Sequence, residues 1–180
     1  EVKPYPPLEQ YGRDIYIREN CNTCHSQMIR PFRAETERYG EYSKSGEFVY
    51  DHPFLWGSKR IGPDLAREGV KKISNTWHLK HLVNPQGTSN GSIMPGYPYL
   101  LEDKIDENFV KTSMAALKKV GVPYPKYYQE LAVTEMRQQA QGIADDLKAN
   151  GEDISADREI IALIAYIQRL GTDTQKHQEK

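Results

Sequence analysis

The chain has 180 residues, of which 38% are apolar and 27% are charged, and this composition is typical of a globular protein rather than a disordered one. Its 24 basic and 25 acidic side chains nearly cancel, which removes the electrostatic basis for a nucleic-acid binder. Two cysteines exclude a disulfide-stapled mini-protein, and the longest apolar run, residues 160–167, is much shorter than the roughly 20 residues of a membrane span.

The first third of the chain is predicted to hold one helix and a long loop. After an extended, proline-rich lead-in over residues 1–7, apolar residues at three- and four-residue steps predict a helix from Leu8 to about Asn20. Residues 26–61 are rich in arginine and in turn signals. We therefore expect irregular structure there, with a short hairpin around residues 46–50.

The remainder is predicted to be helical. A short helix over residues 75–83, with Asn75 as its N-cap, precedes a loop rich in Gly, Ser and Pro. Three further helices are expected over residues 103–120, about 127–149 and about 157–170, before a flexible tail over residues 172–180. The expected buried side of the first of these comprises Ile105, Phe109, Ala116, Leu117 and Val120. The sequence thus predicts one all-α domain spanning residues 1–180.

The segment Cys21-Asn22-Thr23-Cys24-His25 places two thiols three positions apart with an imidazole directly behind them. Residues i and i+3 share a face of a helical turn, so both sulfurs can form thioethers to the two vinyl groups of one haem. His25 then supplies a nitrogen to the iron from the same side. This spacing is the attachment pattern of c-type haem, and it predicts one covalent haem c as the cofactor.

Two haem-free interpretations of the cysteines stay open at this point. A thiol–disulfide CxxC module is expected near a βαβ pattern, and we find none in the sequence. A structural zinc site normally has four ligands. There is no second cysteine pair, however, and His52, His78 and His81 show no zinc-binding spacing.

Met94 is the predicted second axial ligand of the haem iron. It lies in the turn-rich sequence SIMPGYP, where Pro95 restricts the backbone just after the sulfur. The weaker candidates are Met28, Met114, Met136, His78 and His81. Met28 follows His25 too closely to reach the opposite haem face, and Met114 and Met136 have the spacing of buried helix residues. His78 and His81 leave a bis-histidine site as an alternative.

The Gly62-Pro63-Asp64-Leu65 turn lies between the haem motif and Met94. In the haem interpretation, the Pro63 carbonyl accepts the free ring N–H of His25, which fixes the tautomer of the ring and increases its basicity. An ordinary structural turn is the alternative.

With these motifs in this order between two amphipathic helices, the chain resembles class I cytochrome c. By this resemblance, Gly12 and Tyr16 are the contact positions of the first helix, and Leu163 and Tyr166 are those of the last helix. A closer resemblance, over residues 8–125 and 160–171, is to the mono-haem subunit (subunit II) of cbb-type, C-family haem–copper oxidases. It is carried by YGRDIYIRE (11–19), SQMIRPFRAETERYG (26–40), GEFVYDHPF (46–54) and WGSKR (56–60).

This resemblance implies a class I cytochrome c fold with a loop insertion over residues 26–61 and a helical insertion over residues 126–157. It implies an electron relay from a donor c-type cytochrome to the catalytic haem–copper subunit, which reduces oxygen to water. It also implies a periplasmic location, and a membrane anchor or fusion outside this sequence. A soluble mono-haem shuttle and a haem domain of another membrane enzyme are the alternatives. No catalytic residue is expected in the domain itself.

An arginine-rich cluster is the predicted contact for the catalytic subunit or for the haem propionates. It consists of Arg30, Arg33 and Arg38, with Phe32 and Tyr39 between them. A solvated set of salt bridges with Glu35 and Glu37 is the alternative. Trp56 and Trp77 are expected to pack in the core or against the haem.

Overall fold

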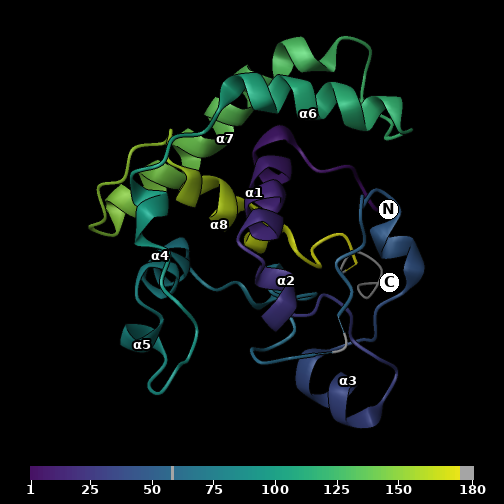
Figure 1. Ribbon diagram of the computed structural model, residues 1–180, viewed down its shortest axis with the longest axis vertical. Coiled ribbons are helices and arrows are strands. Elements are labelled where there is room, and N and C mark those ends of the chain that lie inside the picture. Colours follow the sequence, from purple (N-terminus) through teal and green to yellow (C-terminus); the bar gives the residue numbers. More distant parts are fainter. Residues whose placement is uncertain (58, 175–180) are drawn as a thin grey trace. The chain divides into compact units, whose positions relative to one another are not determined.

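The computed structural model describes residues 1–57 and 59–174, and the α-helices of this part are drawn in Figure 1. They are α1 (Pro7–Arg18), α2 (Cys21–Cys24), α3 (Arg33–Tyr39), α4 (Asn75–Val83), α5 (Pro85–Thr88), α6 (Glu107–Lys119), α7 (Tyr128–Ala149) and α8 (Glu159–Arg169). The 3₁₀ turns are η1 (Ser45–Phe48), η2 (Gly69–Lys71) and η3 (Pro98–Leu101). No strand occurs in the described ranges, so the predicted all-α class is confirmed. Of the tail predicted over residues 172–180, residues 175–180 lie outside the described residues.

The chain divides into two compact units, each assembled from segments distant in sequence. Unit 1 comprises Glu1–Lys3, Tyr16–Lys72 and the described part of Ile167–Lys180. Unit 2 comprises Pro4–Ile15 and Ile73–Tyr166. The cysteine–histidine motif and the Gly-Pro turn therefore belong to unit 1, and the loop of the predicted second ligand belongs to unit 2.

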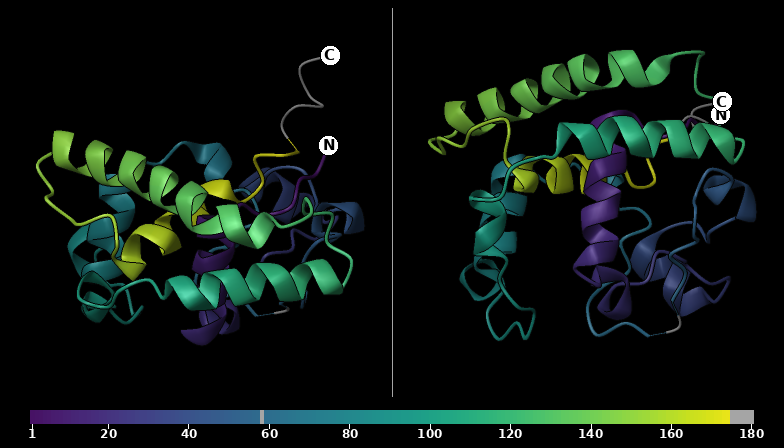
Figure 2. Two further views of the ribbon diagram at one scale, coloured as in Figure 1. Left: turned by 90° about the horizontal axis from the view of Figure 1, so that it is seen from above. Right: turned by 45° about the horizontal axis from the view of Figure 1, so that its top comes forward.

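In unit 2, α6 and α7 pack against each other as an antiparallel pair, which Figure 2 shows. α6 begins after the N-cap Asp106, whose carboxylate accepts the backbone N–H groups of Asn108 and Phe109. α7 buries one stripe at three- and four-residue steps, formed by Ala132, Val133, Met136, Ala140, Ala144 and Leu147. The helix predicted over residues 127–149 is confirmed.

The buried face of α6 differs from the predicted one. Val110 and Met114 are buried, whereas Phe109 is 47% exposed and Val120 is 61% exposed. Of the other predicted core residues, Ile105 is buried ahead of the helix, Leu117 is partly exposed and Ala116 is exposed. Successive residues lie about 100° apart around a helix, so a narrow stripe through Val110 and Met114 turns Phe109 away from it.

The most deeply buried helix is α8, in which every side chain from Ile160 to Ile167 is buried. α1 crosses it at Gly12 (Figure 1). A Cβ atom on Gly12 would lie 1.9 Å from the carbonyl oxygen of Ala162 and 2.8 Å from the Cβ atom of Tyr166. Because only glycine permits so close an approach of two backbones, Gly12 fixes the crossing point. The helices predicted over residues 8–20 and 157–170 are both present.

The structure corrects the hairpin predicted within residues 26–61. This segment contains α3 and the 3₁₀ turn η1, and no hairpin occurs in its described residues. α3 was missed because it is stabilised by charge rather than by apolar periodicity, with an i,i+4 ion pair between Arg33 and Glu37. Gly40, at φ 100°, ends it. Trp56, expected to pack in the core or against the haem, lies outside the core: it is 41% exposed and stacks on Phe54.

Two boundaries in unit 2 also differ from the prediction. The N-cap of α4 is Ser74 rather than Asn75, because the Ser74 hydroxyl accepts the backbone N–H of Trp77 at 3.1 Å. Pro85 begins the short helix α5 in the expected loop, which suits a residue that has no N–H to donate.

Among the described helices, none combines the length and the apolar character that a membrane crossing requires.

Candidate haem site

The two cysteines lie on α2, a single helical turn. The turn follows Asn20, which is in the left-handed conformation at φ 57°. It closes where the backbone N–H of His25 donates to the Cys21 carbonyl at 2.9 Å, and His25 itself is extended. Both thiols are free and partly exposed. The structure therefore holds Cys21, Cys24 and His25 on one short segment, with both cysteines unpaired in disulfides and of intermediate exposure.

The surroundings of Cys21 are unlike those of a redox-active cysteine. Burial raises the pKa of the Cys21 thiol to about 12, and the nearby Glu19 carboxylate adds to the effect. A nucleophilic cysteine requires the opposite shift, because the thiolate is the reactive form. Over residues 1–57 and 59–174, no three His, Cys, Asp or Glu side chains gather as they would around a metal ion.

The His25 ring is held by the Gly-Pro turn. Its Nδ1 atom lies 2.8 Å from the carbonyl oxygen of Pro63. A carbonyl oxygen only accepts, so Nδ1 carries the proton and Nε2 keeps the lone pair that a metal requires. A Cβ atom on Gly62 would lie 2.2 Å from ring atom Cε1 and 2.8 Å from Nε2. Only glycine therefore lets the backbone lie directly against the ring.

Backbone hydrogen bonds pair this turn with the motif on both sides of His25. The Gly62 N–H donates to the Cys24 carbonyl at 3.0 Å, and the Leu65 N–H donates to the Ser26 carbonyl at 2.9 Å. The Tyr16 hydroxyl donates to the carbonyl of His25 itself at 3.1 Å. The imidazole is thus fixed through its ring and through its backbone.

Sequence reasoning missed a network of polar side chains beside the turn. Its members are Ser26, Glu35, Arg60 and Asp64. Arg60 donates to the Ser26 hydroxyl at 2.7 Å and to the Glu35 carboxylate at 2.7 Å. The Ser26 hydroxyl in turn donates to Asp64 at 2.5 Å. The one signal in the sequence was the i,i+4 spacing of opposite charges at Arg60 and Asp64.

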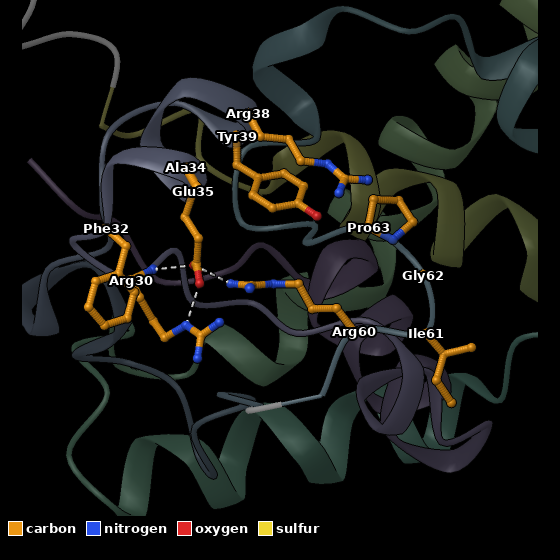
Figure 3. Close-up of a pocket in the computed structure, with 10 residues that line it drawn as sticks. All are labelled: Arg30, Phe32, Ala34, Glu35, Arg38, Tyr39, Arg60, Ile61, Gly62 and Pro63. Carbon is orange, nitrogen blue, oxygen red and sulfur yellow. Dashed lines mark hydrogen bonds and ion pairs between the residues drawn. The ribbon is translucent and has the colours of Figure 1, made fainter.

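The network borders a pocket of about 570 Å³, drawn in Figure 3. Its lining presents the guanidinium groups of Arg30, Arg38 and Arg60 and the carboxylate of Glu35. Glu35 accepts from both Arg30 and Arg60, and the Arg60 hydrogen bond is the main cause that lowers the pKa of Glu35 to about 2. Within the described residues Arg38 pairs with no carboxylate, and its guanidinium lies 5.0 Å from the ring centroid of Tyr39.

The structure divides the predicted arginine cluster. Arg30 and Arg38 line the pocket together with Phe32 and Tyr39. The side chain of Arg33 is 90% exposed, lies outside the pocket and pairs with Glu37. The salt bridges of the alternative interpretation therefore exist, but they leave Arg38 available on the pocket wall.

Met94 lies in unit 2, on the loop between α5 and η3. This loop is anchored to the end of α4, where the Tyr97 N–H donates to the Leu82 carbonyl at 2.8 Å. A Cβ atom on Gly96 would lie 2.5 Å from the Val83 carbonyl oxygen, so the loop passes directly over the helix end. The Met94 side chain is partly exposed, whereas Met114 and Met136 are buried, as predicted for core methionines.

The two histidines of α4 are engaged with neighbouring side chains in unit 2. The His81 ring stacks on Trp77 with centroids 4.6 Å apart, and its Nδ1 lies 2.6 Å from the Thr88 hydroxyl oxygen. His78 is buried and meets the same Trp77 ring edge-on. His81 thus takes part in the packing of α4 against α5, and His78 is buried beside Trp77 on α4.

An all-α fold in which a CxxCH turn follows the first long helix is the arrangement of a c-type cytochrome. The family model described as cytochrome c oxidase, mono-haem subunit/FixO matches residues 1–174, and the chain belongs to this family. The match confirms the resemblance to the mono-haem subunit of cbb-type oxidases and includes residues 126–157. Family membership also means association with the catalytic subunit in an oxidase complex. A search of curated proteins found no match.

Proposed function

We propose that this chain is a one-electron relay in which Cys21 and Cys24 would hold a single haem c through thioethers, and His25 and Met94 would bind its iron. The observation that carries the proposal is the Nδ1 atom of His25, the residue directly after two free cysteines, 2.8 Å from the carbonyl oxygen of Pro63. That hydrogen bond leaves Nε2 free for iron. The bound haem would supply an iron centre that gains and loses one electron.

The protein side chains have positioning roles in this proposal. The two cysteines tether the porphyrin, and His25 is held in one tautomer by Pro63. A thioether ligand favours ferrous iron, so Met94 would raise the reduction potential relative to a second histidine. The relay needs no general acid, base or nucleophile from this chain, because the cofactor carries the redox chemistry.

In the complex, electrons would arrive from a donor c-type cytochrome and leave to the catalytic haem–copper subunit, where oxygen is reduced to water. We place the chain on the periplasmic face of the bacterial inner membrane, because thioether attachment of haem takes place outside the cytoplasm. The pocket of Arg30, Arg38 and Arg60 is the proposed docking surface for an acidic segment of the catalytic subunit. Its excess of guanidinium groups and its Gly62–Pro63 wall, which touches His25, support that position.

The first test is the haem itself. The chain, produced in cells competent in cytochrome c maturation, should give a pyridine haemochrome spectrum with both vinyl groups saturated. The Cys21→Ser variant should give the spectrum of a haem with one remaining vinyl group. A colourless wild-type protein would refute the proposal.

The second axial ligand is tested in the same preparation. The weak sulfur-to-iron charge-transfer band of the ferric protein should vanish in Met94→Ala, because no thioether would then reach the iron. Met28→Ala is the matched control, since Met28 is also partly exposed and should leave the band unchanged. A band that persists in Met94→Ala would exclude Met94 as the ligand.

A further inference from the structure

We propose that Asp64 is a positioning residue for His25. Its carboxylate, together with the Ser26 hydroxyl, keeps the Pro63 carbonyl on the Nδ1 atom of His25 and thereby tunes the electron affinity of the iron. This inference rests on His25 being the proximal ligand, as proposed above. It concerns residues that touch neither iron nor porphyrin in that proposal.

The Asp64 side chain is 0% exposed, and hydrogen bonds satisfy both of its oxygens. Oδ2 accepts from the Ser26 hydroxyl at 2.5 Å and from the Met28 N–H at 3.1 Å. Oδ1 accepts from the Ala66 N–H at 2.8 Å. A buried carboxylate is costly unless its lone pairs are met by donors, so these three donors are held in fixed places around it.

These donors come from the two segments that carry the His25–Pro63 hydrogen bond. Ser26 directly follows His25, and Asp64 directly follows Pro63. The bond from the Ser26 hydroxyl to Asp64 therefore lies one residue further along each segment than the bond from the His25 ring to the Pro63 carbonyl. A change in the first distance moves the backbone that sets the second.

Arg60 neutralises the buried charge and connects it to the pocket. Its Nε atom donates to the Ser26 hydroxyl at 2.7 Å, and its Nη2 atom lies 3.3 Å from Asp64 and 2.7 Å from Glu35. Nη2 also donates to the Met28 carbonyl at 2.7 Å. The guanidinium therefore clamps the segment after His25 to the segment that leads into Pro63.

The expected effect on the iron has a definite sign. A hydrogen bond from Nδ1–H to a carbonyl increases the basicity of the imidazole, which favours ferric iron. Loosening the clamp should therefore shift the reduction potential to more positive values. Removal of the Asp64 charge shifts it in the same direction, so a variant that leaves every charge in place is needed to separate the two causes.

The experiment compares Ser26→Ala, Ser26→Thr and Asp64→Asn in the haem-loaded, ¹⁵N-labelled chain. Solvent exchange of the His25 Nδ1 proton, followed by NMR, should be roughly tenfold faster in Ser26→Ala and in Asp64→Asn, because a supporting hydrogen bond is lost in each. The potential should become more positive in both, and more so in Asp64→Asn. Ser26→Thr keeps a hydroxyl, so its Nδ1 exchange rate and its reduction potential should both return to the wild-type values.

Ser43→Ala is the matched control in unit 1, because the Ser43 hydroxyl is hydrogen-bonded as well but outside the Asp64 network, accepting the backbone N–H of Ile29 at 2.9 Å. It should change neither the exchange rate nor the potential. If Ser26→Ala carries covalent haem with wild-type exchange and potential, the inference is overturned. Should Asp64→Asn not fold, the two Ser26 variants decide the question. Absence of covalent haem from the wild-type chain would instead overturn the proposed function.

Discussion

Glu35 is the carboxylate on which two pocket arginines converge. Its pKa is lowered to about 2, first by the hydrogen bond from Arg60 and then by the Arg30 backbone and side chain, while partial burial opposes these effects. The ordinary value is 4.5, so the pKa of Glu35 is lower in the folded than in the unfolded chain. The ionised carboxylate thus stabilises the fold fully above 4.5, and this stabilisation is lost as the pH falls toward 2.

Glu35→Gln should lower the free energy of unfolding at neutral pH by about 1.5–3 kcal/mol, the range for hydrogen bonds to charged groups. The deficit relative to wild type should shrink as the pH is lowered through about 4. Urea unfolding at a series of pH values measures both. Glu37→Gln on the same helix is the control, because its ion pair with Arg33 is exposed and should contribute less than about 0.5 kcal/mol. A deficit in Glu35→Gln that does not vary with pH would contradict this account.

At the scale of single elements, Gly12 in α1 and Gly142 in α7 form a matched pair. A Cβ atom on Gly12 meets the Ala162 backbone at 1.9 Å, whereas one on Gly142 has no heavy atom within 4 Å. Gly12→Ala should therefore destabilise the protein by about 1–3 kcal/mol or more through overpacking. Gly142→Ala should stabilise it by about 0.5–1 kcal/mol, because alanine loses less conformational freedom in a helix.

Thermal or urea unfolding of the two variants beside wild type measures these effects. The same Gly→Ala change is expected to destabilise the protein at Gly12 and to stabilise it at Gly142. The comparison therefore separates the effect of close backbone packing from that of helix propensity. Equal effects at the two positions would show that the α1–α8 crossing tolerates a methyl group.

The same elements show which parts of the structure the sequence could predict. α1 and α8 follow from the local apolar pattern, α7 matches the polar helix expected after Pro125, and the cysteine–histidine turn follows from five consecutive residues. α3 could not be predicted from apolar periodicity, because its stabilising pattern is charged. The buried face of α6 could not be predicted either, because tertiary packing selects one narrow stripe. The Asp64 network joins residues that are 38 positions apart, as Ser26 and Asp64 are. No local pattern reports such a contact.

At the scale of the whole chain, charge is almost balanced, with a formal net charge of −1. Long-range attraction by net charge therefore cannot direct this chain to an acidic partner, and any electrostatic selectivity must come from a local concentration of charge. The pocket lined by Arg30, Arg38 and Arg60 is such a local concentration of charge. Arg38 and Arg33 lie on the same helix and carry the same charge, but only Arg38 lines the pocket.

Arg38→Glu should therefore weaken binding of the haem-loaded chain to an oxidase core that lacks this subunit, by roughly tenfold or more at low ionic strength. The loss should diminish with added salt, because screening acts on exposed charges. Arg33→Glu makes the same change in net charge outside the pocket and should alter the affinity far less. Affinity is measured by titrating each variant onto the immobilised core at two salt concentrations. Equal losses in the two variants would show that net charge, rather than the pocket, governs docking.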